Sequence, residues 1–290
     1  MLIGQLTDPH VLAGRKKAYG AVDGSALFEA AEDHLFNFRP ALDALVMTGD
    51  LADRGEREAY EFIGERLSRW KVPVRIVPGN HDDRKNMAEV LGDFLPAPDP
   101  AFFPGLGGAE ELGPAKLIFL DSKIEGRHGG GLDGKALSRL GEIISGTPPE
   151  KRILLFVHHP PFASGMGMMD EEYPGLDRLV GILKTRPNLL LCAGHLHRAM
   201  AVDYPGGRAA VAPPVSLQME LELFPSGGDR FRPGAPGYAL HHLENGVLNT
   251  HFGTVPPRGE NPRIFSFSDP TVPGPRDPKF QNPKKHPGFF

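Results

Sequence analysis

The residues best suited to chemistry lie in the tetrapeptide Gly79-Asn80-His81-Asp82, directly after the apolar run 72–77. An amide, an imidazole and a carboxylate at the tip of a buried strand suit a metal site better than a core. We expect Asn80 to offer a neutral oxygen ligand, His81 to stay off the metal for proton chemistry, and Asp82 to hold the His81 ring. Gly79 would let the backbone approach closely. Because turns after strands often have this composition, the tetrapeptide needs support from elsewhere in the chain.

Other apolar runs also end in residue types that bind metals. The run 2–6 leads into Asp8 and His10, and a spacing of two puts both side chains on one face of an extended segment. A turn around the intervening proline is the alternative for this segment. The remaining runs end at Asp50, at His158-His159, and at His195 and His197. Since the carboxyl ends of strands in an open α/β sheet meet in one crevice, we expect these groups to converge.

The converging groups would form an inventory of carboxylates, an amide and several imidazoles. Such a set suits two borderline divalent ions that share a bridging carboxylate. A single histidine or Gly-Asp pair usually has a structural role, but its repetition at successive strand ends favours a site.

The elements that would position these residues alternate along the chain. Continuous apolar runs predict strands at 2–6, 44–47, 72–77, 116–120, 153–157 and 189–192, and helical spacing predicts helices at 25–38, 56–70, 133–144 and 176–184. We place helix N-caps at Ser25 and Asp133, and treat 84–113 as a short helix followed by a Pro- and Gly-rich excursion. Continuous rather than alternating apolar strands are typical of parallel sheets that are covered on both faces.

After Arg198 the alternation of strands and helices is replaced by short strands and turns. Runs at 238–243 and 247–252 around Asn245-Gly246 predict a hairpin with a tight turn. The loop 162–175 is long enough to form one wall of a pocket. Residues 255–290 hold nine prolines and five phenylalanines, too many aromatic side chains for a freely solvated tail. We expect this tail to lie across the domain or a neighbouring subunit.

The ordered motifs D-x-H, G-D, G-N-H-D, H-H-P-P and G-H-x-H, over about residues 2 to 200, resemble the calcineurin-like metallophosphoesterase superfamily. Ala18-Tyr19-Gly20, Met169-Asp170 and the D-x-H opening are similar to its class III cyclic nucleotide phosphodiesterases and the related bacterial glycerophosphodiesterases. The resemblance implies a four-layer α/β/β/α sandwich. In that fold 1–200 would be the catalytic core, 201–254 would complete the second sheet and shape the pocket or a dimer contact, and 255–290 would be a Pro/Phe-rich tail.

The resemblance also implies roles for individual residues. One metal ion would be held by Asp8, His10, Asp50 and His197, and a second by Asp50, Asn80, His158 and His195, with Asp50 as the bridge. The ions would be Fe, Mn, Zn or Co, and a metal-bound hydroxide would attack phosphorus in line. We expect Asp50 and His81 to be catalytic, with His81 stabilising charge or protonating the leaving oxygen. His159 would support the site or the fold rather than bind metal.

Substrate contacts are expected from Asn80, His81 and Tyr19, although a packing role for Tyr19 is an open alternative. The segment Asp53-Arg54-Gly55 also fits the G-D-x-x-D-R-G pattern of Ser/Thr protein phosphatases, in which the arginine contacts phosphate. An ion pair between Asp53 and Arg54 at a helix start is the alternative to such a role.

Together the motifs predict a dinuclear metal-dependent phosphodiesterase for small diesters, either cyclic 3′,5′-nucleotides such as cAMP or glycerophosphodiesters. A phosphomonoesterase or nuclease could use the same site. A non-catalytic scaffold is disfavoured because every implied ligand position is filled.

The composition limits which partners and which compartment we expect for the protein. A net charge of −4 without a basic stripe argues against nucleic acid. One cysteine, Cys192, excludes an intrachain disulfide and suits a reducing compartment. The N-terminus does not look like a signal peptide, and no apolar run approaches the ~18 residues of a membrane span. We therefore expect a cytoplasmic protein, and at least a homodimer, because related enzymes pair through the C-terminal region.

Overall fold

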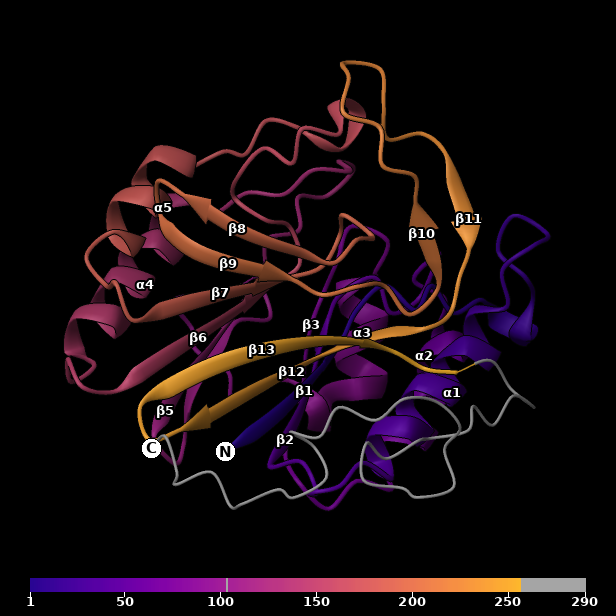
Figure 1. The fold of residues 1–290 in the computed structure, drawn as a ribbon, viewed down its shortest axis with the longest axis horizontal. Coiled ribbons are helices and arrows are strands. Elements are labelled where there is room, and N and C mark those ends of the chain that lie inside the picture. The colour runs from indigo at the N-terminus through magenta and orange to yellow at the C-terminus, as the bar shows by residue number, and fades with distance from the viewer. Residues whose placement is uncertain (103, 257–290) are drawn as a thin grey trace, which may run out of the picture. The chain divides into compact units, whose positions relative to one another are not determined.

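Two β-sheets pack face to face in the part of the chain that the computed structural model describes, residues 1–102 and 104–256 (Figure 1). The first sheet has the order β13 (Val247–Thr254), β12 (Gly237–Glu244), β1 (Leu2–Leu6), β2 (Ala44–Thr48) and β3 (Val74–Val77). The second has the order β4 (Gly108–Leu112), β5 (Ala115–Leu120), β6 (Arg152–Val157), β7 (Leu189–Ala193), β9 (Gly207–Val211) and β8 (Met200–Tyr204). A separate two-stranded ribbon pairs β10 (Leu217–Met219) with β11 (Phe231–Pro233).

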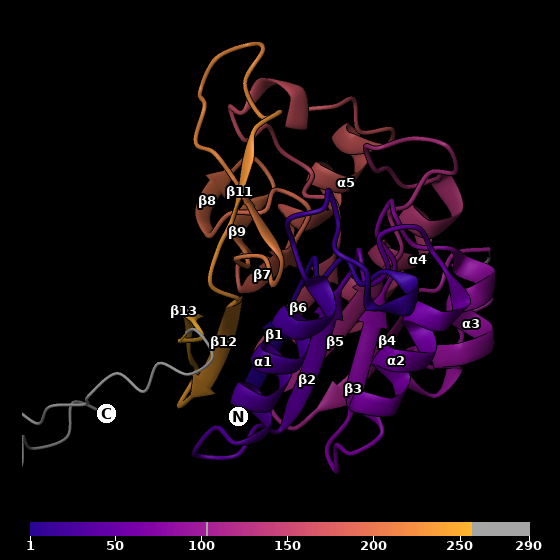
Figure 2. The same cartoon turned by 90° about the vertical axis from the view of Figure 1, so that its right-hand side faces the viewer.

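Helices cover the outer face of each sheet, which confirms the predicted α/β/β/α layering. On the first sheet these are α1 (Gly24–Phe36), α2 (Arg57–Leu67) and α3 (Arg84–Leu91), and on the second they are α4 (Gly134–Gly146) and α5 (Leu176–Leu183) (Figure 2). Short 3₁₀ turns occupy Ala13–Arg15, Gly92–Phe94 and Gly167–Met169. One apolar cluster lies between each sheet and its helices, and a third fills the space between the two sheets. In this third cluster Phe119 and Phe156 stack with ring centroids 5.7 Å apart. The central strands are buried on both faces, as their continuous apolar sequences predict.

Parallel pairing brings the carboxyl ends of the central strands to one edge. In the first sheet Leu6 pairs with Met47, and Thr48 pairs with Val77. In the second sheet Leu120 pairs with Val157, and Phe156 pairs with Cys192. The segments that carry the predicted ligands therefore leave both sheets on the same side.

The structure corrects three predictions of local structure. Helix α1 is capped by Asp23, whose carboxylate accepts a hydrogen bond from Ala26 N at 2.9 Å, and not by Ser25, which is buried inside the first turn. Strand β4 lies within the expected excursion 84–113. It is an antiparallel edge strand with the sequence Gly-Ala-Glu-Glu-Leu, so it has no apolar run to reveal it.

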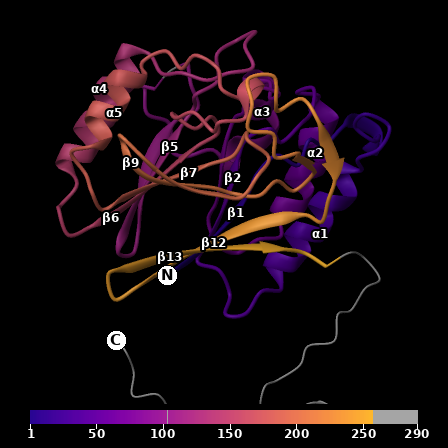
Figure 3. The ribbon, with the colours of Figure 1, turned by 45° about the horizontal axis from the view of Figure 1, so that its top comes forward.

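The third correction concerns the C-terminal strands. The predicted hairpin around Asn245-Gly246 is present as β12 and β13, with both turn residues at positive φ (Figure 3). However, only β8 and β9 extend the second sheet, whereas β12 pairs with β1 and extends the first. The free edge of β1 accepts it in antiparallel register. The predicted Pro/Phe-rich tail from 257 to 290 lies outside the described residues. Among the described helices, none has the length and apolar character needed to cross a membrane.

A buried polar chain connects β12 to the strand ends. His241 Nε2 lies 2.9 Å from Gln5 Oε1, and the Gln5 amide nitrogen donates to Thr48 Oγ1 at 2.8 Å and to Ala193 O at 3.1 Å. Because Gln5 presents its oxygen, His241 Nε2 carries the proton and Nδ1 accepts from the Thr250 hydroxyl at 2.9 Å. His241 is thus a neutral donor, and burial lowers its pKa to about 4.

This network predicts acid sensitivity of the fold. The unfolded chain binds a proton at His241 below pH 6.5, whereas the folded chain binds it only near pH 4, so stability falls as the pH falls through this window. We expect a loss of about 2 kcal/mol by pH 4.5 from this group. Urea unfolding of metal-free protein at pH 7 and pH 4.5 would show it, and His241→Gln should reduce the difference by that amount. Equal pH dependence of the two proteins would contradict the assignment.

Candidate metal centre

The predicted ligands stand on sharply turned backbone at the strand ends. Positive φ angles between 48° and 68° occur at Asp8, His10, Asp50, His195 and His197. This conformation is uncommon for residues other than glycine and persists only where the surroundings enforce it. Here the segments after β1 and β2 brace each other, because Asp8 N donates to Gly49 O and His10 N donates to Asp50 O, both at 3.1 Å. Such clustering of strained residues is typical of a functional site.

Two glycines allow these segments to come close together. A Cβ at Gly79 would lie 2.1 Å from Asp50 Oδ1, and one at Gly194 would lie 2.0 Å from Thr7 Oγ1. Both contacts are far shorter than van der Waals distances. The close backbone approach expected at Gly79 is therefore present.

Four predicted ligands form one cluster. The ligand atoms of Asp8, His10, Asp50 and His197 all lie within 4.8 Å of one another, and all four residues are buried. His197 Nε2 is 3.3 Å from Asp8 Oδ1, and His10 Nε2 is 3.6 Å from Asp50 Oδ2. The two imidazole nitrogens, His10 Nε2 and His197 Nε2, face each other at 3.2 Å.

Hydrogen bonds at Nδ1 fix which ring nitrogen faces the centre. Asp53 Oδ1 lies 3.0 Å from His10 Nδ1, Thr48 O lies 2.7 Å from His158 Nδ1, and Leu217 O lies 2.8 Å from His197 Nδ1. Each partner is an acceptor, so Nδ1 carries the proton and Nε2 is left bare. This arrangement is usual for metal-binding histidines.

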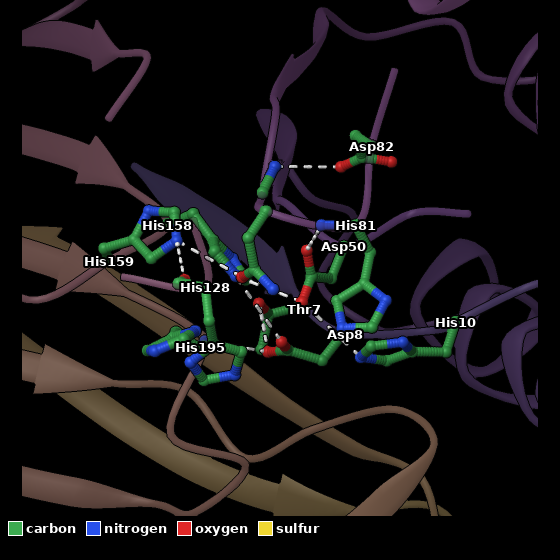
Figure 4. Close-up of polar contacts among 12 residues, drawn as sticks. Thr7, Asp8, His10, Asp50, His81, Asp82, His128, His158, His159 and His195 are labelled. Carbon is green, nitrogen blue, oxygen red and sulfur yellow. Dashed lines mark hydrogen bonds and ion pairs between the residues drawn. The ribbon is translucent and has the colours of Figure 1, made fainter. Parts of the chain in front are cut away.

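A second cluster lies beside the first and consists of His158, His159 and His195 (Figure 4). Asp50 Oδ2 is 3.3 Å from His158 Nε2 and 3.6 Å from His10 Nε2, so one carboxylate oxygen lies between the two clusters. Asn80 adjoins the second cluster, with its Oδ1 3.2 Å from His159 Nε2. Both nitrogens of His159 are engaged, since Nδ1 lies 2.8 Å from the Ser122 hydroxyl. His159 is therefore better placed to orient Asn80 than to bind an ion.

The unpaired atoms of the site fit metal ions. Asp8 Oδ1 and His158 Nε2 are buried and have no hydrogen-bond partner among the described residues. A buried polar atom without a partner costs about 1–3 kcal/mol, and here bare imidazole nitrogens also face each other. Cations would satisfy all of these atoms at once. The donor set of two carboxylates, one amide and imidazoles is appropriate for iron, manganese, zinc or cobalt.

Electrostatics keep the carboxylates ionised. Burial opposes ionisation of Asp50, but the neighbouring His158 and His10 hold its pKa well below the ordinary value. Burial likewise opposes ionisation of Asp8, yet His197 and His158 lower its pKa to about 2. Burial and the adjacent imidazoles lower the pKa of His195, which leaves it neutral and able to coordinate. The ionised carboxylates and the neutral His195 are in the forms that metal binding requires. Burial opposes protonation of His158, yet Asp50 and Asp8 raise its pKa to about 9, and Asp8 likewise raises the pKa of His197, so an ion that binds these two rings displaces a proton from them.

The structure corrects the expected partner of His81. The Asp82 carboxylate does not hold the ring. It accepts hydrogen bonds from Gly79 N, Leu51 N and Ala52 N and from the Tyr60 hydroxyl, at 2.9–3.2 Å. His81 Nδ1 instead lies 2.7 Å from Asp53 O, while His81 N donates to Asp50 Oδ1 at 2.9 Å. The His81 side chain is 29% exposed, and within residues 1–102 and 104–256 no hydrogen bond is made by its Nε2.

The remaining predicted residues lie at the edge of the site. Tyr19 is 66% exposed and packs on Phe231 with ring centroids 4.8 Å apart, outside both clusters. The Arg54 side chain is 72% exposed, and its Nε lies 3.8 Å from Asp53 Oδ2, so the pair is loose. Asp53 does more than pair with Arg54, because its carboxylate orients the His10 ring and its carbonyl orients the His81 ring. Its position three residues after Asp50 is the only sequence signal of this role.

Asp53 gives a testable prediction. Asp53→Asn keeps the shape of the side chain but removes the charge that fixes the His10 tautomer. We expect a loss of about 10- to 100-fold in metal affinity or activity, as is typical for residues behind metal ligands. Metal titration and turnover would measure it, with Asp133→Asn, at the N-cap of α4, as the control. Unchanged metal affinity and turnover in Asp53→Asn would show that His10 does not depend on this contact.

Comparisons with known proteins agree with this geometry. Residues 1–199 match the family model described as calcineurin-like phosphoesterase. The chain is 31% identical over 255 residues to the "Probable glycerophosphodiester phosphodiesterase GpdQ" of Arcobacter nitrofigilis, which covers 87% of this chain and 92% of that protein. It is 29% identical over 270 residues to the "cAMP/cGMP dual specificity phosphodiesterase" of Mycobacterium tuberculosis, which covers 91% of this chain and 82% of that protein.

Solved structures show the same fold at lower identity. Purple acid phosphatase from yellow lupin aligns with a TM-score of 0.57 at 11% identity, over 88% of this chain and 51% of that chain. GAP50 of Plasmodium, described as an anchor in the inner membrane complex, aligns with a TM-score of 0.60 at 15% identity, over 90% of this chain and 86% of that chain. With the family model matched over residues 1–199, the chain belongs to the calcineurin-like phosphoesterase family.

Proposed function

We propose that the protein is a dinuclear metal-dependent phosphodiesterase that hydrolyses small diesters, either cyclic 3′,5′-nucleotides such as cAMP or glycerophosphodiesters. The observation that carries this proposal is the position of Asp50 Oδ2 between two clusters of bare donors. A shared carboxylate at that point suits two ions rather than one. Asp8, His10, Asp50 and His197 would hold the first ion, and Asp50, Asn80, His158 and His195 would hold the second. The donors suit iron, manganese, zinc or cobalt.

When bound, the ions supply an activated water and neutralise charge on the phosphoryl oxygens. The side chains then divide the remaining work. Asp53 O holds a proton on His81 Nδ1, so Nε2 can donate a proton to the departing alkoxide only when the ring carries a second proton there, as an imidazolium. The hydrogen bond from His81 N to Asp50 Oδ1 ties this proton donor to the bridging carboxylate. Asn80 would contact the phosphate from the other side, with its amide held by His159.

The names of two relatives support a diester substrate. The names of the two proteins compared above describe a glycerophosphodiester phosphodiesterase and a cyclic nucleotide phosphodiesterase. Both names describe hydrolysis of a phosphodiester, and the two identities to this chain are similar, 31% and 29%.

Turnover of metal-loaded protein on four substrates tests the proposal. These are cAMP, glycerophosphoethanolamine, bis(p-nitrophenyl) phosphate, and p-nitrophenyl phosphate as the monoester. We expect both the synthetic diester and one natural diester to be hydrolysed faster than the monoester. Preference for the monoester, or no diester hydrolysis at all, would overturn the proposed reaction.

We further infer that the protein forms at least a homodimer. Exposed apolar side chains gather along the chain around β10 and β11, with Leu221, Leu223 and Phe224 exposed by 57%, 65% and 48%. Exposed apolar residues that cluster in this way often mark contact surfaces. Light scattering should give at least twice the monomer mass of 31.5 kDa, and a mass near the monomer would refute the inference.

A further inference from the structure

The segment 121–131, which follows β5, packs against the second cluster. Its Ser122 hydroxyl lies 2.8 Å from His159 Nδ1, and its His128 O lies 3.0 Å from His159 Nε2 (Figure 4). A carbonyl oxygen can only accept, so Nε2 carries the proton and can also donate to Asn80 Oδ1 at 3.2 Å. The segment therefore fixes the His159 ring, and the ring in turn holds the Asn80 amide.

A lysine from the same segment reaches the backbone of Asn80. Lys123 Nζ donates to Asn80 O at 3.0 Å, and the lysine side chain is only 7% exposed. Its ammonium also lies 3.4 Å from Glu125 Oε2, on a side chain that is 70% exposed. A lysine is rarely buried to this extent without a specific partner. Here that partner is the carbonyl of a proposed metal ligand.

This carbonyl belongs to the peptide group that joins Asn80 to His81. The N–H of the same peptide group donates to Asp50 Oδ1 at 2.9 Å. The peptide group is thus held at both of its polar atoms, by Asp50 after a strand of the first sheet and by Lys123 after a strand of the second. A proposed ligand and the proposed proton donor extend from its two ends. Fixing the peptide group therefore fixes the origin of both side chains.

The backbone of Lys123 is itself fixed to the same stretch of chain. Arg84, the first residue of α3, donates to the two Asp121 carboxylate oxygens at 2.6 and 2.8 Å and to Lys123 O at 2.6 Å. Lys123 N donates to Asp121 Oδ1 at 3.0 Å, and the Asp121 side chain is only 1% exposed. The lysine is therefore anchored at its main chain as well as at its ammonium, an arrangement suited to holding a neighbour in a precise position.

We propose that Lys123 is a positioning residue, which holds the peptide group between Asn80 and His81 so that Asn80 faces the second ion and His81 faces the departing alkoxide. This inference rests on the proposed function. The proposed ligands of the first ion lie outside the segments 80–84 and 121–131, so the effect of Lys123 should fall on the second ion and on proton transfer. A purely electrostatic role predicts the opposite sign for metal binding. An ammonium repels cations, so removal of its charge alone would strengthen their binding.

Mn²⁺ titration of metal-free Lys123→Met tests the effect on the ions. We expect two ions per chain, one bound as in the parent and the other about tenfold more weakly, as is typical for residues behind metal ligands. Arg152→Met is the matched control. Arg152 Nη2 also donates to a backbone carbonyl, Gly246 O at 2.6 Å, but it stands at the amino end of β6, at the opposite end of that strand from His158. This control should leave both affinities within about twofold of the parent.

Two further measurements separate positioning from a general loss of structure. Thermal unfolding of the metal-free variants shows whether each is folded. Lys123→Arg keeps a charged donor, so it should bind the second ion more tightly than Lys123→Met does. Unchanged or stronger binding of both ions by Lys123→Met, an equal loss for both ions, or no recovery in Lys123→Arg would overturn the inference.

Turnover at saturating Mn²⁺ tests the effect on His81. In Lys123→Met we expect kcat to fall about tenfold on the natural diester that the parent hydrolyses, whether cAMP or glycerophosphoethanolamine. The loss on bis(p-nitrophenyl) phosphate should be smaller, within about threefold, because p-nitrophenolate departs without a proton. Equal losses on the two diesters would overturn the assignment. A parent protein that binds fewer than two ions or hydrolyses no diester would instead refute the proposed function, and this inference with it.

Discussion

Asp50→Asn is expected to reduce turnover on bis(p-nitrophenyl) phosphate at least about a thousandfold and to lower the metal content of the protein. The reason is the place of the Asp50 carboxylate. One oxygen, Oδ2, lies 3.3 Å from His158 Nε2 and 3.6 Å from His10 Nε2, between the two clusters of bare nitrogens. An amide provides a weaker, uncharged ligand there, so both ions would lose their shared anion.

The fold should survive this change, because the asparagine oxygen can still accept the hydrogen bond that His81 N donates to Asp50 Oδ1. Asp203→Asn, at an exposed position in β8, is the matched control and should behave like the parent. Metal analysis and single-substrate kinetics of the two variants would measure the effect. Near-normal turnover of Asp50→Asn with metal present would rule out Asp50 as the bridge.

Asp82→Ala is expected to destabilise the fold by about 3–5 kcal/mol, because it leaves several buried donors without an acceptor. The Asp82 carboxylate is 2% exposed and ties the segment after β2 to the segment after β3 through Leu51 N, Ala52 N and Gly79 N. Its fourth donor is the hydroxyl of Tyr60, which is fully buried in α2. Without this carboxylate the two ligand-bearing segments would also lose their mutual position.

Asp83→Ala is the control for this change. Asp83 caps α3 by accepting a hydrogen bond from Asn86 N at 2.8 Å, so its loss should cost only about 1 kcal/mol. Urea unfolding of the two variants, both metal-free, would compare these free energies directly. A similar, small effect of both substitutions would mean that the buried Asp82 network contributes little to stability.

The gathering of the candidate ligands could be predicted from the sequence, because it depends on a general property of parallel sheets. Asp8, Asp50 and His158 each follow a continuous apolar strand, and parallel strands deliver such residues to one edge. The α/β/β/α layer order came instead from the family resemblance, because strands buried on both faces fit helices on both sides of a single sheet equally well.

The partners of the ligands could not be predicted in this way. Asp82 follows His81 in the chain, and a neighbouring carboxylate is a natural candidate to hold the ring. The turn directs Asp82 into the core and brings the Asp53 carbonyl to His81 instead. Such a contact depends on the φ angles of two separate turns, and no local pattern encodes them. Positive φ at a non-glycine residue such as Asp50 is likewise imposed by tertiary contacts.

The positions of the outer strands of the sheets could not be predicted, for a different reason. Strand β4 is partly exposed, so its sequence has no continuous apolar run. Strand β12 was recognised, but its place beside β1 depends on which sheet edge is free. That is a property of the whole topology, and the sequence of β12 does not contain it.

The central claim is that one chain holds two metal ions which share Asp50, and titration of metal-free protein with Mn²⁺ tests it most directly. Bound metal and hydrolysis of bis(p-nitrophenyl) phosphate should be followed together in the parent and in Asp50→Asn. We predict two ions bound per chain in the parent, with most of the activity appearing as the second ion binds, and weaker binding of both ions in the variant. A single ion at full activity, or binding that is unchanged in Asp50→Asn, would contradict the dinuclear site.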